Sequence, residues 1–133
     1  VKPGWFAQEG ETLDPDRTAT ELVRQKTPYT EGEARAWLHR FLFTSANVNN
    51  PVRTLSYGER SRLALALLIL DGCNLLLDEP LNHLDITSRD QFEQALGEFT
   101  GTLAIVLHDL YAVERICTRR IDIANGRLTE ILL

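Results

Sequence analysis

The chain has 133 residues, of which 44% are hydrophobic and 25% charged, a composition that excludes the disordered and fibrous classes and suits one compact domain. Its formal net charge of −5 argues against a broad nucleic-acid-binding surface, because such surfaces need clustered Lys and Arg. The longest apolar run, residues 63–70, is far shorter than the roughly 20 residues of a membrane-spanning helix, and no charged-then-apolar leader opens the sequence. We therefore expect a cytoplasmic protein without direct membrane insertion.

The first third of the sequence predicts a short strand followed by two helices. Residues 4–8 form the strand, and the polar residues 14–16 mark a turn. The first helix covers residues 20–26. The second begins at Thr30, where Glu33 completes a capping box. Its apolar face is expected to carry Ala34, Trp37, Leu38, Phe41 and Leu42.

A second capping box, Ser56 with Glu59, predicts the start of a third helix after a loop over residues 47–51. The body of this helix, residues 63–70, is apolar almost all the way round, so it must be buried. Gly72 is placed to end it, because glycine readily adopts the left-handed conformation found at helix C-termini.

The second half of the sequence alternates strands and helices. Residues 74–77 form an apolar run that stops abruptly at Asp78, a pattern typical of a central strand covered on both faces. A helix over residues 88–99 leads to a second apolar strand, residues 102–107, and this order implies parallel pairing. The remaining elements are a helix over residues 111–118 and a hairpin of residues 120–124 and 127–132 around a type I′ turn. The fold class is therefore α/β, with a mainly helical insertion between residues 14 and 55.

Polar residues follow both apolar strands, at the edge where open α/β sheets bind their ligands. Because adjacent side chains on an extended chain point in opposite directions, one carboxylate of Asp78-Glu79 could hold Mg²⁺ while the other faces a nucleophilic water. His108 follows the second strand and could hydrogen-bond a terminal phosphate. Ser56 opens a helix whose N-terminal N–H groups attract phosphate. Taken singly, each also has a structural explanation, as a strand end, a structural histidine and a helix cap.

Taken in chain order, these residues resemble the motifs of the ATP-binding cassette (ABC) ATPases. Residues 55–59, Leu-Ser-Tyr-Gly-Glu, are similar to the family signature, and residues 75–80 resemble the Walker B strand with its catalytic glutamate. Asp85 fits the D-loop, His108 the switch histidine and Gln8 the Q-loop glutamine. Residues 80–85, Pro-Leu-Asn-His-Leu-Asp, are close to the run typical of the ABC-F group, soluble twin-cassette proteins that act on ribosomes.

The resemblance implies a P-loop NTPase-like, mainly parallel nucleotide-binding domain with ATP and Mg²⁺ as ligands. Residues 1–13 and 71–133 would form its core sheet and helices, and about residues 14–70 a helical subdomain that includes the signature helix. In this family two cassettes face each other, so that each ATP lies between the Walker motifs of one cassette and the signature of the other. The implied partners are therefore a second ABC cassette and, for an ABC-F protein, the ribosome.

The same resemblance assigns a role to each motif residue. Asp78 would organise Mg²⁺, Glu79 would act as general base or orient the attacking water, and His108 would contact the γ-phosphate. Gln8 would touch the metal or the water, and Asp85 would couple the two sites. The residues implied to contact the partner cassette's nucleotide are Leu55, Ser56, Tyr57, Gly58 and Glu59.

The sequence departs from the family pattern in three places. Tyr57 stands where the family usually has Gly, a residue that lets the backbone approach phosphate closely, and Leu81 replaces the usual Thr. No G-x-x-x-x-G-K-[ST] run occurs in the sequence, so the main β- and γ-phosphate ligands are missing. We therefore expect an N-terminally truncated cassette that is inactive by itself.

Three functional hypotheses remain open. The first is ATP binding and hydrolysis as part of an ABC-F-like twin-cassette ATPase acting on ribosomes. The second is a non-catalytic cassette that serves only as a protein-interaction module, and the third is the ATPase subunit of an ABC transporter. Micromolar, Mg²⁺-dependent nucleotide binding would separate the first from the second, and a membrane subunit encoded nearby would favour the third.

Overall fold

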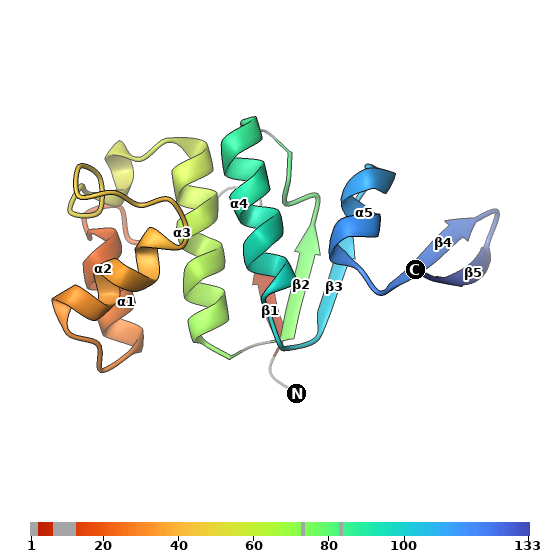
Figure 1. The fold of residues 1–133 in the computed structure, drawn as a ribbon, viewed down its shortest axis with the longest axis horizontal. Helices are drawn as coiled ribbons and strands as arrows, with labels where there is room; N and C mark the ends of the chain where they lie inside the picture. Colours follow the sequence, from red (N-terminus) through yellow and green to blue (C-terminus); the bar gives the residue numbers. More distant parts are fainter. Residues whose placement is uncertain (1–2, 7–12, 73, 83) are drawn as a thin grey trace.

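The sheet of the protein consists of three parallel strands, β1 (Pro3–Phe6), β2 (Asn74–Asp78) and β3 (Leu103–Val106). The computed structural model describes residues 3–6, 13–72, 74–82 and 84–133. β2 lies in the centre, so the predicted parallel pairing of the two apolar strands is confirmed (Figure 1). Asp78 lies opposite Val106, which brings the carboxyl ends of β2 and β3 to one edge of the sheet.

Helices form the part of the chain between β1 and β2: α1 (Ala19–Lys26), α2 (Glu31–His39), the 3₁₀ turn η1 (Val52–Thr54) and α3 (Tyr57–Leu70). Each α-helix begins with a complete capping box, formed by Thr18 with Glu21, Thr30 with Glu33 and Ser56 with Glu59. The reciprocal hydrogen bonds of such a box satisfy N–H groups that the helix itself leaves unpaired.

Helix α3 is the central element of the core. Leu63 and Leu65 are fully buried, as expected for a helix that is apolar on nearly every side, and Figure 1 shows α3 between α1 and α4 (Ile86–Gly97). The helix ends at Leu70, and Gly72 follows with a φ of 61°, which confirms the predicted helix stop.

The chain ends with α5 (Leu110–Ile116) and a hairpin of β4 (Arg119–Ala124) and β5 (Arg127–Leu132). Asn125 and Gly126 have φ angles of 50° and 73°, and the positive sign at both positions is what a type I′ turn requires. The predicted hairpin is therefore confirmed. Among the described residues, no helix combines the length and the apolar character needed to cross a membrane.

Two sequence predictions about burial and helix length are wrong. Helix α2 ends at His39, so Phe41 and Leu42 do not extend its apolar face. The chain turns there, with Leu42 at a φ of 61°, and this turn places both Phe41 and Phe43 in the core.

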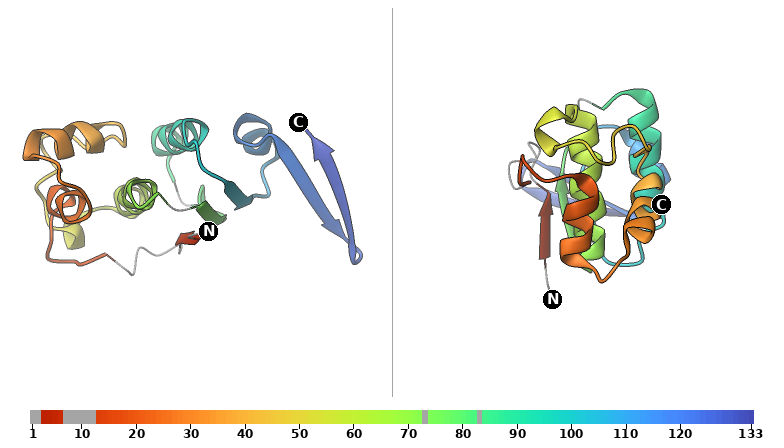
Figure 2. Two further views of the ribbon diagram at one scale, coloured as in Figure 1. Left: turned by 90° about the horizontal axis from the view of Figure 1, so that it is seen from below. Right: turned by 90° about the vertical axis from the view of Figure 1, so that its left-hand side faces the viewer.

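The second wrong prediction is that the sheet is covered on both faces, which the apolar run of residues 74–77 indicated. The structure instead shows alternating exposure along the neighbouring strand β3, with Ala104 exposed and Val106 50% exposed. The reason is visible in Figure 2, where α3, α4 and α5 all lie on the same side of the sheet.

Candidate nucleotide-hydrolysis site

Glu79 and His108 meet at the carboxyl edge of the sheet, one residue after β2 and two residues after β3. Glu79 Oε1 lies 2.9 Å from His108 Nε2. The two side chains have opposite environments, because Glu79 is only 16% exposed whereas His108 is 90% exposed. A half-enclosed carboxylate beside a solvent-facing imidazole can hold a water molecule and a phosphate oxygen at adjacent positions.

The Glu79 backbone adopts an unusual conformation that redirects its side chain from the line of the strand. Its φ of 46° lies in the left-handed region, which non-glycine residues seldom occupy except where surrounding contacts enforce it. Those contacts are two backbone hydrogen bonds: the Glu79 N–H donates to the Val106 carbonyl at 3.0 Å, and the Asn82 N–H donates to the Glu79 carbonyl at 3.1 Å. The first of these ties Glu79 directly to the strand that precedes His108.

The buried oxygen of Glu79 has no well-aligned hydrogen bond to any described residue. Its 2.9 Å approach to His108 Nε2 is close enough for an ion pair but lacks hydrogen-bond alignment. A buried carboxylate oxygen left in this way is costly unless it has another partner. A water molecule is the simplest partner that fits.

Asp78, the last residue of β2, carries the other carboxylate of the edge. Its side chain is exposed, and within the part of the chain that the structure describes no side chain is bonded to it. Mg²⁺ in phosphate-transfer sites is commonly held by one or two carboxylates together with substrate phosphates and water. The exposed Asp78 carboxylate is a ligand of this kind at the sheet edge.

The signature residues Ser56 to Glu59 form the first turn of α3. The Glu59 carboxylate is occupied there, accepting from the Ser56 N–H and from Asn47 Nδ2, both at 2.7 Å. Burial opposes ionisation of Glu59, but the hydrogen bonds from Ser56 and Asn47 outweigh it and lower the pKa of its carboxyl. The Glu59 side chain therefore stabilises the helix start itself.

The signature turn contacts the start of α4 within the same chain. Arg62 is buried and donates from Nη1 to Ser88 Oγ at 2.7 Å, and Gly58 lies so close to Ser88 that an added Cβ would be 3.5 Å from its Oγ. Asp85 is the N-cap of α4, and although its side chain makes no capping hydrogen bond, the nearby Ser88 hydroxyl lowers its pKa. The signature and the D-loop residue thus share one packed corner.

The structure brings together some of the sequence-predicted site residues and keeps others apart. It unites Asp78, Glu79 and His108 at the sheet edge, and it places Leu55 to Glu59 with Asp85 at the α3–α4 corner. Gln8, predicted to touch the metal or the water, lies outside the described residues.

Comparison with known sequences decides the family. The sequence profile of the ABC transporter family matches residues 2–82, which include the signature, the β2 strand and the Asp78-Glu79 pair. The chain belongs to the ABC transporter family. The relatives that it resembles include ABC-F proteins.

Three curated relatives show which branch of the family this cassette resembles. It is 42% identical over 134 residues to the ATP-binding protein YdiF of Bacillus subtilis, covering 99% of this chain and 21% of that protein. It is 35% identical over 130 residues to the ribosome protection protein VmlR of the same organism, covering 97% of this chain and 24% of VmlR. It is 36% identical over 133 residues to ABC transporter F family member 5 of Arabidopsis thaliana, covering 98% and 19%. The cassette therefore spans about a fifth to a quarter of the length of these relatives.

A solved structure supports the fold independently of close sequence similarity. The ATP-binding cassette MJ0796, in a dimeric post-hydrolysis state bound to ADP and Pi, matches with a TM-score of 0.75 at 24% identity, covering 98% of this chain and 62% of that one. The α/β, P-loop NTPase-like fold expected from the sequence is confirmed.

Sequence reasoning missed the side chains that hold the cassette's motifs in place. Ser88, Arg89, Glu93 and Arg115 carry no family motif, yet they connect the first turns of α4 to α3 and α5. The Arg89–Glu93 spacing of four residues signals a helical ion pair, but it gives no indication of the partners on other elements.

Proposed function

We propose that this cassette supplies the hydrolytic edge and the signature turn of an ATPase in an ABC-F-like protein that acts on ribosomes. The observation that carries the proposal is the Glu79–His108 pair, whose 2.9 Å approach leaves a buried carboxylate oxygen without an aligned hydrogen bond. Such an oxygen is suited to orient a water molecule for attack on phosphate, with the imidazole beside it.

The roles of the edge residues follow from their positions. Glu79 holds the attacking water and accepts its proton, while the exposed His108 donates to a γ-phosphate oxygen and so stabilises the charge that develops there. The exposed Asp78 carboxylate, directly before Glu79, would hold Mg²⁺ through water. When bound, Mg²⁺ neutralises charge on the phosphate oxygens.

The complete site needs residues from outside this sequence. No phosphate-binding G-x-x-x-x-G-K-[ST] run is present, so the residues that cradle the β- and γ-phosphates must be supplied by another segment or chain. A second cassette would face the signature turn, where the N-terminal end of α3 favours negative charge and Asp85 lies close to the same corner.

The link to translation comes from the relatives. VmlR is described as a ribosome protection protein. The similarity to VmlR covers 97% of this chain. The run at residues 80–85, close to that of the ABC-F group, agrees with this branch rather than with a transporter subunit. The ribosome, in the cytoplasm, is therefore the partner that we propose.

The test of hydrolysis is Glu79→Gln in the complete assembly, meaning this cassette together with the phosphate-loop segment and the facing cassette. We expect kcat to fall about 100-fold or more, since general bases typically contribute 10²–10⁴-fold, while ATP binding is retained. The matched control is Glu98→Gln, which alters an exposed ion pair with Arg40 and should leave turnover unchanged.

Two results would contradict the proposal. If Glu79→Gln hydrolyses ATP at the wild-type rate, Glu79 is not the base. If the wild-type assembly binds no nucleotide, the interaction-module hypothesis is favoured instead. ATP-dependent cosedimentation with ribosomes tests the translation role, and its absence would favour a transporter.

A further inference from the structure

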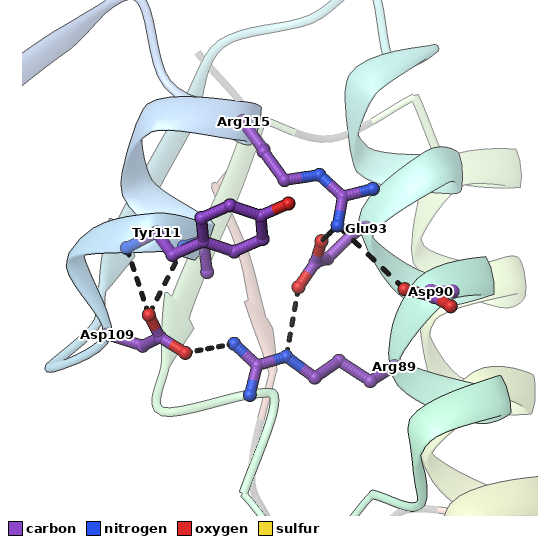
Figure 3. Close-up of polar contacts among 7 residues, drawn as sticks. Arg89, Asp90, Glu93, Asp109, Tyr111 and Arg115 are labelled. Atoms are coloured by element: carbon purple, nitrogen blue, oxygen red, sulfur yellow. Dashed lines mark hydrogen bonds and ion pairs between the residues drawn. The ribbon is translucent and has the colours of Figure 1, made fainter.

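Four charged side chains link α4 to the segment that carries His108 (Figure 3). Arg89, on the first turn of α4, donates to Asp109 and forms a second ion pair with Glu93, at 3.0 Å between Nε and Oε1. Arg115, on α5, forms an ion pair with the other Glu93 oxygen at 3.0 Å, without the alignment of a hydrogen bond. We call these residues, Arg89, Glu93, Asp109 and Arg115, the α4–α5 clamp.

Asp109 connects the clamp to the catalytic edge because it is the residue directly after His108. Its Oδ1 accepts hydrogen bonds from the N–H groups of Tyr111 at 2.9 Å and Ala112 at 3.4 Å, which caps α5. Its Oδ2 accepts from Arg89. One carboxylate thus fixes both where α5 begins and how far that start lies from α4.

His108 itself has little else to hold it. Its side chain is 90% exposed, and among the described residues the side-chain contact that it makes is with Glu79. Helix α5 spans just Leu110–Ile116, and so short a helix is not stable without tertiary contacts. The direction in which the imidazole approaches Glu79 therefore depends on the backbone anchored at Asp109.

The second part of the clamp makes this anchor rigid. The Glu93 side chain is 3% exposed and lies between the two guanidinium groups. A buried carboxylate requires such partners, since an unpaired one would be strongly disfavoured. Arg115 also lies 5.5 Å from the Tyr111 ring centre, which adds a cation–π contact on α5. Arg89 is consequently held on one side by Glu93 while it binds Asp109 on the other.

We propose that Arg89 is a positioning residue for hydrolysis, which sets the orientation of His108 toward Glu79 through Asp109. It touches neither nucleotide nor the reacting atoms. The inference rests on the proposed ATPase function, and it adds that the helix beginning at the D-loop residue Asp85 controls the switch histidine of the same cassette. Small errors in such an orientation strongly reduce the rate of hydrolysis, because a displacement of about 1 Å can lower a rate roughly 100-fold.

The test compares Arg89→Ala with Arg89→Lys in the complete assembly. Arg89→Ala should lower kcat about tenfold to 100-fold while KM for ATP stays near wild type, since the residue does not contact nucleotide. Arg89→Lys keeps a cation near Asp109 and should recover part of the loss. Hydrogen exchange of amides in residues 108–112 should rise in Arg89→Ala and remain normal in residues 57–70.

The matched control is Arg35→Ala, which removes an exposed ion pair with Glu31 on α2 and should change neither kcat nor exchange at residues 108–112. Three results would overturn the inference: unchanged exchange at residues 108–112, a change confined to KM, or exchange that rises throughout while kcat per folded molecule stays constant. The exchange measurement does not require turnover. An assembly without ATPase activity would therefore refute the proposed function, and the role of Arg89 would still be decided by exchange.

Discussion

The two ends of this cassette are held together in different ways. At the helical end, residues 13–72, every α-helix starts with a capping box and the apolar side chains close into a core that includes the fully buried Leu38. At the hairpin end, residues 107–133, large apolar side chains lie at the surface, such as Ile123 at 77% and Leu128 at 72% exposure. Figure 1 shows this hairpin at the opposite extreme of the molecule from α1 and α2.

The difference shows which contacts position each half of the candidate site. The signature turn belongs to the helical end, where local hydrogen bonds and a closed core fix α3. His108 belongs to the hairpin end, where the α4–α5 clamp and an ion pair of Arg115 with Asp90, at 3.8 Å, link α5 to α4. The stability of the helical end should therefore be most sensitive to the removal of apolar side chains. The stability of the hairpin end should be most sensitive to the removal of charged ones.

The largest effect is expected from removing both cations of the clamp. The double variant Arg89→Ala/Arg115→Ala leaves Glu93 buried without a partner, and we expect a loss of about 3–5 kcal/mol in the free energy of unfolding. The measurement is urea unfolding followed by far-UV circular dichroism. Adding Glu93→Leu should recover most of the loss, because the buried charge is then gone. Equal losses with and without Glu93→Leu would show that packing, and not charge, holds this end.

A smaller loss of stability is expected when the same substitution, Leu→Ala, is made once at each end. Leu38→Ala opens a cavity in the closed core and should cost about 2–5 kcal/mol in the free energy of unfolding. Leu128→Ala, in the exposed hairpin, should change it by no more than about 0.5 kcal/mol. In a Trp5→Phe background, fluorescence of Trp37 on α2 can report unfolding of the helical end. A Leu128 variant as destabilised as the Leu38 variant would contradict the exposure of this side chain in the hairpin.

Many elements at both ends could be predicted from the sequence because their signals are local. At the helical end these are the capping boxes at Thr30 and Ser56 and the glycine at position 72, and at the hairpin end the type I′ turn, and the structure confirms them. The early end of α2 could not be predicted, since the left-handed turn at Leu42 serves to bury Phe41 and Phe43 against distant residues.

The candidate site shows the same division. The shared edge of Glu79 and His108 followed from two apolar strands that end in polar residues, and the structure confirms that they meet. The left-handed backbone at Glu79 and the Arg89–Asp109 pair did not follow, because each depends on how β3 and α4 pack in three dimensions. The catalytic roles stay predictions until turnover is measured.

The smallest effect that separates the two ends is the acid sensitivity of the Arg89–Asp109 pair. Hydrogen bonding from Arg89 lowers the pKa of Asp109 below its ordinary value of 3.8, with the Tyr111 and Ala112 amides adding to the effect. Because the folded pKa lies below the unfolded one, the stabilisation is fully present above about pH 4 and is lost as the pH falls through the folded pKa. The measurement is the ratio of exchange protection in residues 110–112 between wild type and Arg89→Ala. We expect a constant ratio from pH 7 to pH 5 that shrinks toward one below pH 4, while Arg35→Ala shows no such change in this segment. A ratio that stays constant down to pH 3 in a still-folded protein would show that the Arg89 guanidinium acts by packing. The charge of Asp109 would then not stabilise the start of α5.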